Sequence, residues 1–282
     1  MSARIAARIV IQGVIHTVAL AAPLTLAGTL GGCGIVYQPA KFKGAKSTAA
    51  PHVVGSPLNV VSDNGAITVT MAPGNEVLVT ASIRAESQAR LDAVTVNLDR
   101  REDGTLAVRV NWPEGRRGPS EGADLEISLP DATGVTLKTS NGALTTRGLS
   151  GPADLQTSNG AVTVHGHTGH VTAKSSNGRI ELYDVPSAVA DTSNGRVMVR
   201  LTASGEGPVE LDTSNGAITL EVGPGFNAQL TASTSNGGVS CSAAGAKVIS
   251  TGKGRGSFTF GEGTQACKLH TSNGGITISN RP

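Results

Sequence analysis

The sequence predicts an all-β solenoid, a parallel β-helix, and three observations carry that prediction. An Asn-Gly pair preceded by small polar residues recurs at near-constant spacing along the chain. The residues on both sides of each pair alternate between apolar and polar, which is typical of short strands with one buried face. Only 2% of the 282 residues are aromatic, whereas 37 are Gly. The core must therefore be thin and regular, as it is in a coil of stacked short strands.

Residues 1–32 are predicted to be an export signal. Arg4 and Arg8 precede an apolar stretch over residues 9–26, which is the order found in signal peptides. Leu30-Gly31-Gly32-Cys33 is similar to the lipobox of bacterial lipoproteins, in which the cysteine is acylated, with palmitate for example, and becomes the first residue. An uncleaved membrane anchor is the alternative, because the stretch is long enough to span a bilayer. We expect lipid attachment at Cys33 to hold the exported protein at the cell membrane or outer membrane.

The mature chain has no excess of basic residues. Removal of residues 1–32 takes away two arginines and no acidic residue, which leaves 21 Lys and Arg against 21 Asp and Glu. Without a basic stripe that also carries stacking aromatic rings, the chain has no electrostatic reason to bind phosphate backbones, so we exclude nucleic acid as a partner. Residues 33–57 begin with the lipidated cysteine and continue as a polar segment, which we expect to be a flexible tether.

The Asn-Gly motif is the repeating unit of the predicted solenoid. From Asn141 onward the copies are 18, 18, 17, 21 and 21 residues apart, and the last gap of 37 contains a degraded copy at residues 251–254. We expect each coil to stack on the one before it in sequence, roughly 4.8 Å further along the axis. The structural turns are Asn64-Gly65, Asn141-Gly142, Asn159-Gly160, Asn177-Gly178, Asn194-Gly195, Asn215-Gly216, Asn236-Gly237 and Asn273-Gly274.

Each motif connects two short strands. Apolar residues stand six and four positions before the Asn and three and five positions after it, so they share one face and are expected to point inward. At the turn, Asn tolerates a left-handed backbone and Gly supplies a positive φ. An antiparallel hairpin is the alternative, because Asn-Gly between alternating strands is its strongest signal. Hairpins, however, have no reason to repeat the same turn at a constant period.

The segment between the first and second motif does not follow the repeat. Strand patterns cover residues 77–83, 94–98, 105–111 and 124–129, a short helix is expected near residues 87–91, and Glu102-Asp103-Gly104 suits a turn. An exposed solenoid end has unpaired backbone groups, so we expect this insertion to cover it. We therefore divide the chain into a β-rich N-terminal part with the first repeat, residues 58–134, and the β-helix repeats, residues 135–282.

The Thr-Ser-Asn-Gly motifs, together with residues 63–69, 76–81 and 124–130, carry a family resemblance over the chain from about Leu58 onward. The sequence resembles the bacterial putative-adhesin family, a repeat domain of uncharacterised function that is related to auto-transporter adhesin head domains. The resemblance implies a right-handed β-helix with an adhesin-like or scaffolding role in the cell envelope. It supplies no catalytic residues and no cofactor.

Two groups of side chains are candidates for a metal-binding or catalytic site. His165, His167 and His170 have a spacing that would suit a metal, but the repeat directs them outward, inward and into a corner, so we expect no metal site. Asp191 and Asp212 lie one coil apart in an outward row, where a charged surface is the simpler interpretation. We therefore expect no enzyme. The alternatives are a β-helical polysaccharide lyase or hydrolase, and an envelope-stress regulatory component that acts through a protein partner.

Two cysteines remain after Cys33, and both fall at inward positions of the repeat. Cys241 and Cys267 either form a disulfide, as leftover cysteines of exported proteins often do, or serve as small buried apolar side chains. The sequence favours neither alternative.

One outward row differs from the Thr and Ser rows around it. It stands six residues after the Asn of successive motifs, and it contains one of the two tyrosines of the chain. Tyr and Arg are well suited to anchor a partner, so we expect this row to contact an extended glycan or an envelope protein. An open C-terminal end at residues 276–279 is the second expected contact surface. The row consists of Arg147, His165, Tyr183, Arg200 and Glu221.

Overall fold

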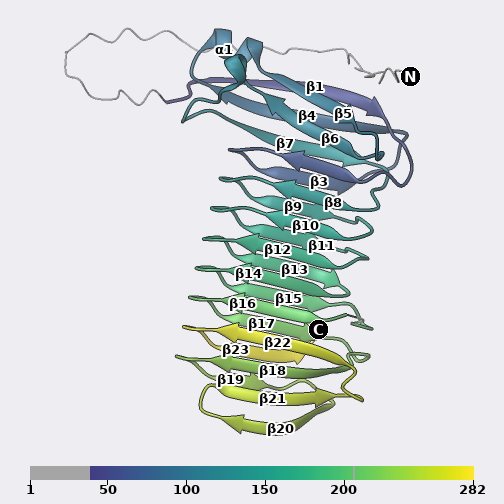
Figure 1. The fold of residues 1–282 in the computed structure, drawn as a ribbon, viewed down its shortest axis with the longest axis vertical. Helices are drawn as coiled ribbons and strands as arrows, with labels where there is room; N and C mark the ends of the chain where they lie inside the picture. Colours follow the sequence, from purple (N-terminus) through teal and green to yellow (C-terminus); the bar gives the residue numbers. More distant parts are fainter. Residues whose placement is uncertain (1–38, 206) are drawn as a thin grey trace, which may run out of the picture.

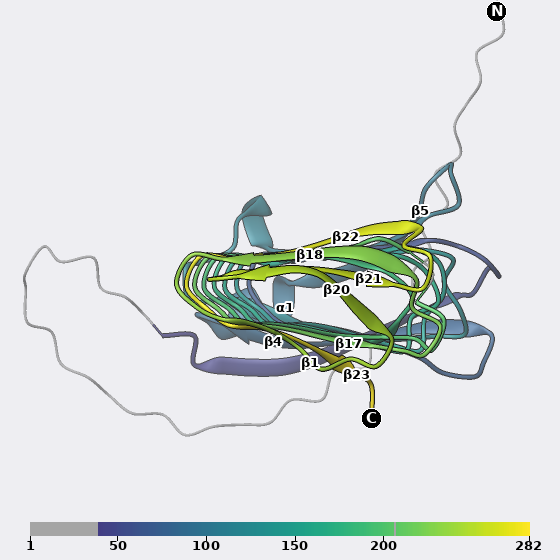
Figure 2. The same cartoon turned by 90° about the horizontal axis from the view of Figure 1, so that it is seen from below.

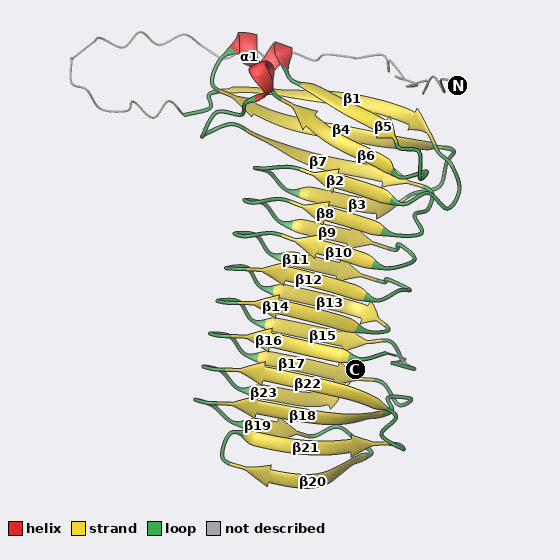
Figure 3. Ribbon diagram, in the orientation of Figure 1, coloured by secondary structure: helices red, strands yellow, loops and turns green. Residues whose placement is uncertain are grey.

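The computed structural model describes residues 39–205 and 207–282. The expected export signal, residues 1–32, and the lipidation site Cys33 lie outside the described residues. The described part is a stack of coils built from two long sheets, with one short α-helix, α1 (Gln88–Ala93), at the N-terminal end (Figure 1; Figure 3). Seen along the stack, the two sheets form two flattened layers (Figure 2). The expected fold class, an all-β parallel β-helix with a β-rich N-terminal cap, is confirmed.

Each regular coil gives one strand to each sheet, and neighbouring coils pair in parallel. Sheet A contains, in spatial order, β1 (Phe42–Pro51), β4 (Glu76–Ala85), β7 (Gly122–Leu129), β3 (Ile67–Met71), β9 (Leu144–Arg147), β11 (Val162–His165), β13 (Ile180–Val185), β15 (Val197–Leu201), β17 (Ile218–Val222), β23 (Ile276–Asn280) and β19 (Val239–Cys241). Sheet B contains β20 (Ala246–Gly252), β21 (Arg255–Phe260), β18 (Ala228–Thr234), β22 (Gln265–Thr271), β16 (Val209–Thr213), β14 (Ala188–Thr192), β12 (Val171–Ser175), β10 (Ala153–Gln156), β8 (Val135–Lys138), β2 (Leu58–Val61), β6 (Leu106–Asn111) and β5 (Thr95–Arg100).

The core lies between the two sheets and consists mostly of Val, Leu, Ile and Ala. The positions six and four before each motif Asn, and three and five after it, are buried as predicted in nearly every coil. The exceptions are Val239 and Cys241, which are only half-buried because β19 is the edge strand of sheet A. The alternation of apolar and polar residues therefore sets which face of each strand enters the core.

The turn glycines allow close stacking, which corrects the expected role of the motif. Among the described motif residues only Gly65 has a positive φ, at 145°, and no motif Asn is left-handed. A Cβ on Gly178 would come within 1.6 Å of the carbonyl oxygen of Gly160, one coil away, and a Cβ on Gly160 within 1.8 Å of that of Gly142. A side chain at these positions would push the coils apart. Glycine is thus required by the contact between coils and not by the backbone conformation of the turn.

Two ladders of side-chain hydrogen bonds run along the motif edge. On the outside, the Asn177 amide donates to Oδ1 of Asn159 at 2.7 Å and accepts from Asn194 at 2.8 Å. On the inside, from the second motif onward, the first residue of the motif is a buried Thr or Ser whose hydroxyl bonds the glycine carbonyl of the neighbouring coil. Thr213 Oγ1 donates to the Gly195 carbonyl at 2.8 Å. The inner ladder satisfies the buried hydroxyl group of each of these motifs.

The last coil in sequence is not the last coil in space. β22 pairs with β16 on one side and β18 on the other, and β23 lies between β17 and β19. In Figure 1 the C-terminus accordingly lies beside the stack near β17, above its lower end. The expectation that every coil stacks on its predecessor is therefore wrong at this point, as is the expected open end at residues 276–279.

A hairpin closes the C-terminal end of the stack. β21 pairs antiparallel with β18, and β20 pairs antiparallel with β21. Residues 251–254, interpreted from sequence as a degraded motif, are the last two residues of β20 and the two-residue turn into β21. Because antiparallel pairing reverses the chain, the hairpin allows the last segment to return and fill the space between two earlier coils.

The insertion after the first motif covers the N-terminal end of the stack, as predicted. The hairpin of β5 and β6 extends sheet B, β4 and β7 extend sheet A, and α1 lies over the end (Figure 1). The expected tether is wrong for residues 42–51, which form β1 and pair antiparallel with β4 along their whole length. Small side chains such as Ala45, Ser47 and Ala49 fit this added edge strand, although Phe42 and Thr48 are the only strong strand formers in the segment.

A buried ion pair fixes the helix to this cap. The carboxylate of Glu121 is fully buried and accepts hydrogen bonds from Nε and Nη2 of Arg90, both at 2.8 Å. The amide groups of Gly118 and Glu86 also donate to it. Burial alone would raise the pKa of Glu121, but these hydrogen bonds outweigh burial and lower the pKa to about 2.

Candidate binding surface on sheet A

The predicted contact row is continuous on the outer face of sheet A. The register pairs Arg147 with His165, His165 with Tyr183, Tyr183 with Arg200, and Arg200 with Glu221. Five consecutive strands, β9, β11, β13, β15 and β17, therefore each present one member. The structure brings together every residue of the row that the repeat alignment selected.

The side chains of the row contact one another as a stack. The rings of His165 and Tyr183 lie 5.0 Å apart with an angle of 12° between their planes. On the other face of the phenol ring, the Arg200 guanidinium lies 5.5 Å from the ring centroid, and its Nε also bonds Glu221 at 2.6 Å. Burial, and to a lesser extent the positive charge of Arg147, lowers the pKa of His165. The imidazole is therefore mostly neutral at pH 7.

A second departure from the repeat lies beside this row, and reasoning from the sequence missed it. Two positions after the motif Asn, six of the eight copies have Ala or Gly, and four positions after it, six have Thr or Ser. The exceptions are Arg179, directly before β13, with Glu181 on β13, and Arg196, directly before the adjacent strand β15, with Met198 on β15. Both departures thus fall on the same two neighbouring coils, next to Tyr183.

These residues form a compact charged cluster. Nε of Arg179 lies 3.1 Å from Glu181, and Nη2 of Arg196 contacts the other carboxylate oxygen. The Glu181 side chain is only 10% exposed, whereas those of Arg179 and Arg196 are 56% and 61% exposed. Burial would raise the pKa of Glu181, but the hydrogen bonds from the two arginines lower it. The carboxylate therefore anchors two guanidinium groups that face solvent.

A bulge places one more acidic residue beside the row. Asp184 has a φ of 56°, and the register between β13 and β15 shifts across it. Its carboxylate bonds Nη2 of Arg281 at 2.9 Å, and Nη1 of Arg281 donates to the carbonyl of Leu201. Arg281 follows the inserted strand β23, so the C-terminal segment takes part in this surface. Bulges are frequent next to functional sites because they redirect side chains.

The histidines and aspartates considered in the sequence analysis do not form one site. His165 belongs to the row, His167 is buried, and Nδ1 of His170 bonds the Ser187 hydroxyl at 2.8 Å. Within residues 39–205 and 207–282, no three His, Cys, Asp or Glu side chains lie close enough together to hold a metal ion. Asp191 and Asp212 pair in register on β14 and β16 at the surface of sheet B.

The two cysteines lie on different sheets and both are free. Cys241 is on β19 of sheet A, and Cys267 is on β22 of sheet B. Burial raises the pKa of the Cys267 thiol. The structure therefore has no disulfide between them; Cys267 serves as a small buried side chain, whereas Cys241 is only half-buried.

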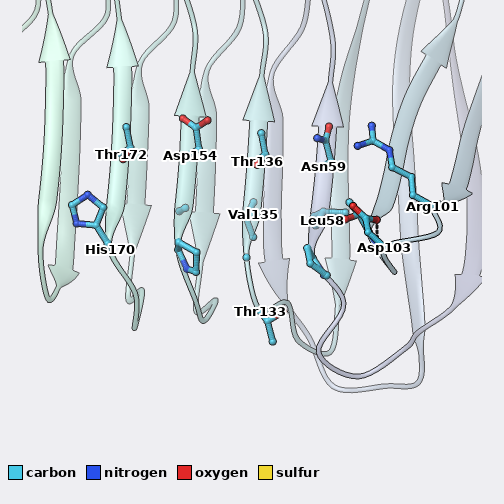
Figure 4. A pocket seen from close by; sticks show the side chains of 15 residues that line it. Leu58, Asn59, Arg101, Asp103, Thr133, Val135, Thr136, Asp154, His170 and Thr172 are labelled. Carbon is cyan, nitrogen blue, oxygen red and sulfur yellow. Dashed lines mark hydrogen bonds between the residues drawn. The ribbon is translucent and has the colours of Figure 1, made fainter.

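A shallow trough lies on the opposite face, on sheet B. Its volume is about 500 Å³. Asn59, Thr136, Asp154 and Thr172 project from neighbouring strands in one row, with Arg101 and His170 towards its two ends (Figure 4). The corresponding outward positions vary along the whole of sheet B, from Val189 to Lys268. The trough therefore lacks the localised departure from the repeat that distinguishes the surface of sheet A.

The model of the Toastrack DUF4097 family matches residues 57–279. The chain belongs to the Toastrack family. The match covers the same part of the chain in which the motifs predicted the resemblance to the putative-adhesin family. No curated protein matches the chain, and in the described part of this Toastrack protein no helix is both long and apolar enough to cross a membrane.

Several solved structures are similar to this Toastrack chain, and two of them come from Bacteroides fragilis and Clostridium sporogenes. A putative adhesin from Bacteroides fragilis is 13% identical with a TM-score of 0.45, and the similarity covers 86% of this chain and 99% of that one. A putative cell adhesion protein from Clostridium sporogenes is 10% identical with a TM-score of 0.36, covering 84% and 100%. At these identities and TM-scores, neither similarity identifies a ligand.

Proposed function

We propose that this Toastrack protein is an exported, lipid-anchored, non-catalytic envelope protein with an adhesin-like role, and that it binds its ligand on the outer face of sheet A. The observation that carries the proposal is the position of the departures from the repeat. A scaffold made of identical coils needs the same residue types in every coil, yet the two coils that contain β13 and β15 replace Ala and Thr by charged and large side chains. Such a replacement on two adjacent coils indicates a surface that serves binding.

The proposed anchor places this surface away from the membrane. Phe42, where β1 begins, is nine residues after Cys33, so the intervening chain spans at most about 30 Å. The cap end of the stack would face the lipid, and the coils would extend outward. Cys33→Ala should abolish both fatty-acid labelling and membrane retention. Labelling that survives this substitution would exclude the lipid anchor.

Binding to isolated cell envelopes tests the role of sheet A. The triple variant Arg147→Ser, Tyr183→Ser and Arg200→Ser should keep the circular dichroism and melting of the native protein and lose at least about tenfold in affinity, because it removes the anchors of the row. The matched control is the double variant Lys138→Ser and Lys174→Ser, which also removes two positive charges, from the outer face of sheet B. Equal binding by the triple variant and the native protein would refute the proposed surface.

A further inference from the structure

We propose that the sheet A surface recognises anionic groups, carboxylate or phosphate, spaced along an extended polymer. This inference rests on the proposed function and names the ligand chemistry. We call the surface the arginine patch; it contains Arg147, Arg179, Arg196, Arg200 and Arg281 together with Glu181, Asp184 and Glu221. Five guanidinium groups face three carboxylates, and with a neutral His165 the patch carries net positive charge.

Around Glu181 and Glu221, the solvent-exposed surface of the patch is more positive than a count of its charged residues suggests. The carboxylates of Glu181 and Glu221 are 10% and 16% exposed, while their partners Arg179, Arg196 and Arg200 are 56%, 61% and 27% exposed. At Glu181 and Glu221 a ligand therefore meets guanidinium groups first, and these two acids hold their arginines in place, which lowers the conformational entropy lost on binding. Asp184 differs, because its carboxylate is 48% exposed and its partner Arg281 is 31% exposed.

The arginines keep donors available for a ligand. Among the described residues, Arg179 bonds Glu181 through Nε, Arg196 bonds it through Nη2, and Arg147 makes no ion pair. Each guanidinium has five N–H donors in a planar fork that matches the two oxygens of a carboxylate or phosphate. Several N–H groups on each of these arginines thus remain free to bind an anion.

The surroundings of the aromatic residue in the patch disfavour a neutral sugar as the ligand. Sugar rings usually pack on an open aromatic face, but the faces of Tyr183 are covered by His165 on one side and Arg200 on the other. Tyr183 offers a ligand its ring edge and hydroxyl group, and the hydroxyl donates well to anionic oxygens. The geometry thus favours charge recognition over stacking.

The patch is also long enough for an extended polymer to contact several of its arginines. Arg147 and Arg200 are separated by three strand spacings, roughly 14 Å along the stack, and Arg179 and Arg196 by one, roughly 4.8 Å. A polymer with repeated anionic groups that lies along the axis would meet several guanidinium groups in succession. Multiple weak charge contacts of this kind make affinity strongly dependent on salt.

The test measures binding of the purified mature protein to three polymers. Polygalacturonate supplies carboxylates, poly(glycerol phosphate) supplies phosphates, and dextran is neutral. We expect at least one anionic polymer to bind, with affinity falling about tenfold or more between 50 and 300 mM NaCl, and no binding of dextran. The two anionic arms distinguish a carboxylate source from a phosphate source.

Substitutions locate the binding. Arg179→Ala with Arg196→Ala introduces the residue found in other coils and should weaken polyanion binding at least tenfold, whereas Lys138→Ser with Lys174→Ser should not. Equal losses in both variants, binding of dextran, or binding that salt does not weaken would overturn the inference. If neither polyanion binds while envelope binding still depends on the row, the proposed function stands and the inference fails. If envelope binding is also unaffected by the triple Ser variant, both fail.

Discussion

Asn273 donates a side-chain hydrogen bond to Oδ1 of Asn215 at 2.9 Å, and it accepts one from Asn236 at 2.8 Å. Along the stack, the asparagine ladder thus passes from Asn215 to Asn273, in the last motif of the chain, and only then to Asn236, in the preceding motif. The segment that contains Asn273 fills a slot between two earlier coils. The C-terminal segment is therefore an internal part of the core.

Deleting residues 264–282 should unfold the lower part of the stack and not merely shorten it. The deletion removes four buried apolar side chains, those of Cys267, Leu269, Ile276 and Ile278, each contributing about 1.5–3 kcal/mol. The loss of about 6–12 kcal/mol is comparable with the whole stability of a typical domain. Urea unfolding followed by circular dichroism measures this loss. A truncated protein with an unchanged midpoint would contradict the observed order of the coils.

The sequence could not reveal this order, because the motif is nearly the same in every coil. The motif at Asn273 could form the asparagine hydrogen bonds and the close glycine contact equally well with any other motif. What places it between Asn215 and Asn236 is the reversal of the chain at the β20–β21 hairpin. The unusual gap of 37 residues before Asn273 indicated an irregularity, yet it fits an extra coil as well as a hairpin.

Gly178→Ala should be far more damaging than Asn177→Ala. The added methyl group would lie 1.6 Å from the Gly160 carbonyl oxygen, so two coils must separate, at a cost of more than about 3 kcal/mol. Asn177→Ala removes two exposed hydrogen bonds, worth about 1 kcal/mol together. Chemical denaturation of both variants compares them. A larger loss for the Asn variant would show that the turn conformation, and not close stacking, makes the glycine necessary.

His167→Leu should raise stability in acid. The ring is 2% exposed, and burial lowers its pKa below the ordinary value of 6.5, while the backbone of Gly151 opposes this shift more weakly. The native state therefore prefers the neutral ring. As the pH falls below 6.5 the unfolded chain binds the proton first, and the native protein loses up to about 1.4 kcal/mol per pH unit until the folded pKa is reached.

Melting temperatures of the native protein and the Leu variant between pH 7.5 and 5 test this prediction. The difference in melting temperature should grow in favour of the variant as the pH falls. Leu149 and Val185 occupy the same position in neighbouring coils, so leucine suits the site. A difference that stays constant with pH would show that His167 is not held neutral by the fold.

Glu121→Gln should destabilise the N-terminal cap by about 3 kcal/mol at pH 7, because it leaves the Arg90 guanidinium in a partly buried position without its counter-charge. The folded pKa of Glu121 is lowered to about 2 from 4.5. The stabilisation from its ionisation is therefore full above about pH 4.5 and is lost as the pH falls towards 2. Urea unfolding at pH 7 and pH 3 should show a smaller difference between native and variant proteins at pH 3. An equal difference at both values would contradict the pairing.

Half of the candidate surface could be predicted from the sequence. The row through Tyr183 follows from counting six residues past each motif, because the period holds from Asn141 to Asn215. Arg179 and Arg196 carry the same kind of signal and become visible when the positions two after the Asn are compared. Asp184 and Arg281 are different, because a bulge and a strand inserted out of order bring them together. No spacing in the sequence encodes that contact.

Reverting two coils to the repeat tests the central claim most directly. The quadruple variant Arg179→Ala, Glu181→Thr, Arg196→Ala and Met198→Thr gives the two coils that contain β13 and β15 the residues found at these positions in most other coils. If these residues serve binding, the variant should melt at the same or a higher temperature, since consensus residues generally stabilise a fold, and its affinity for isolated envelopes should fall at least tenfold. A melting temperature lower by several degrees, with envelope binding unchanged, would show that the cluster serves the scaffold and would contradict the account.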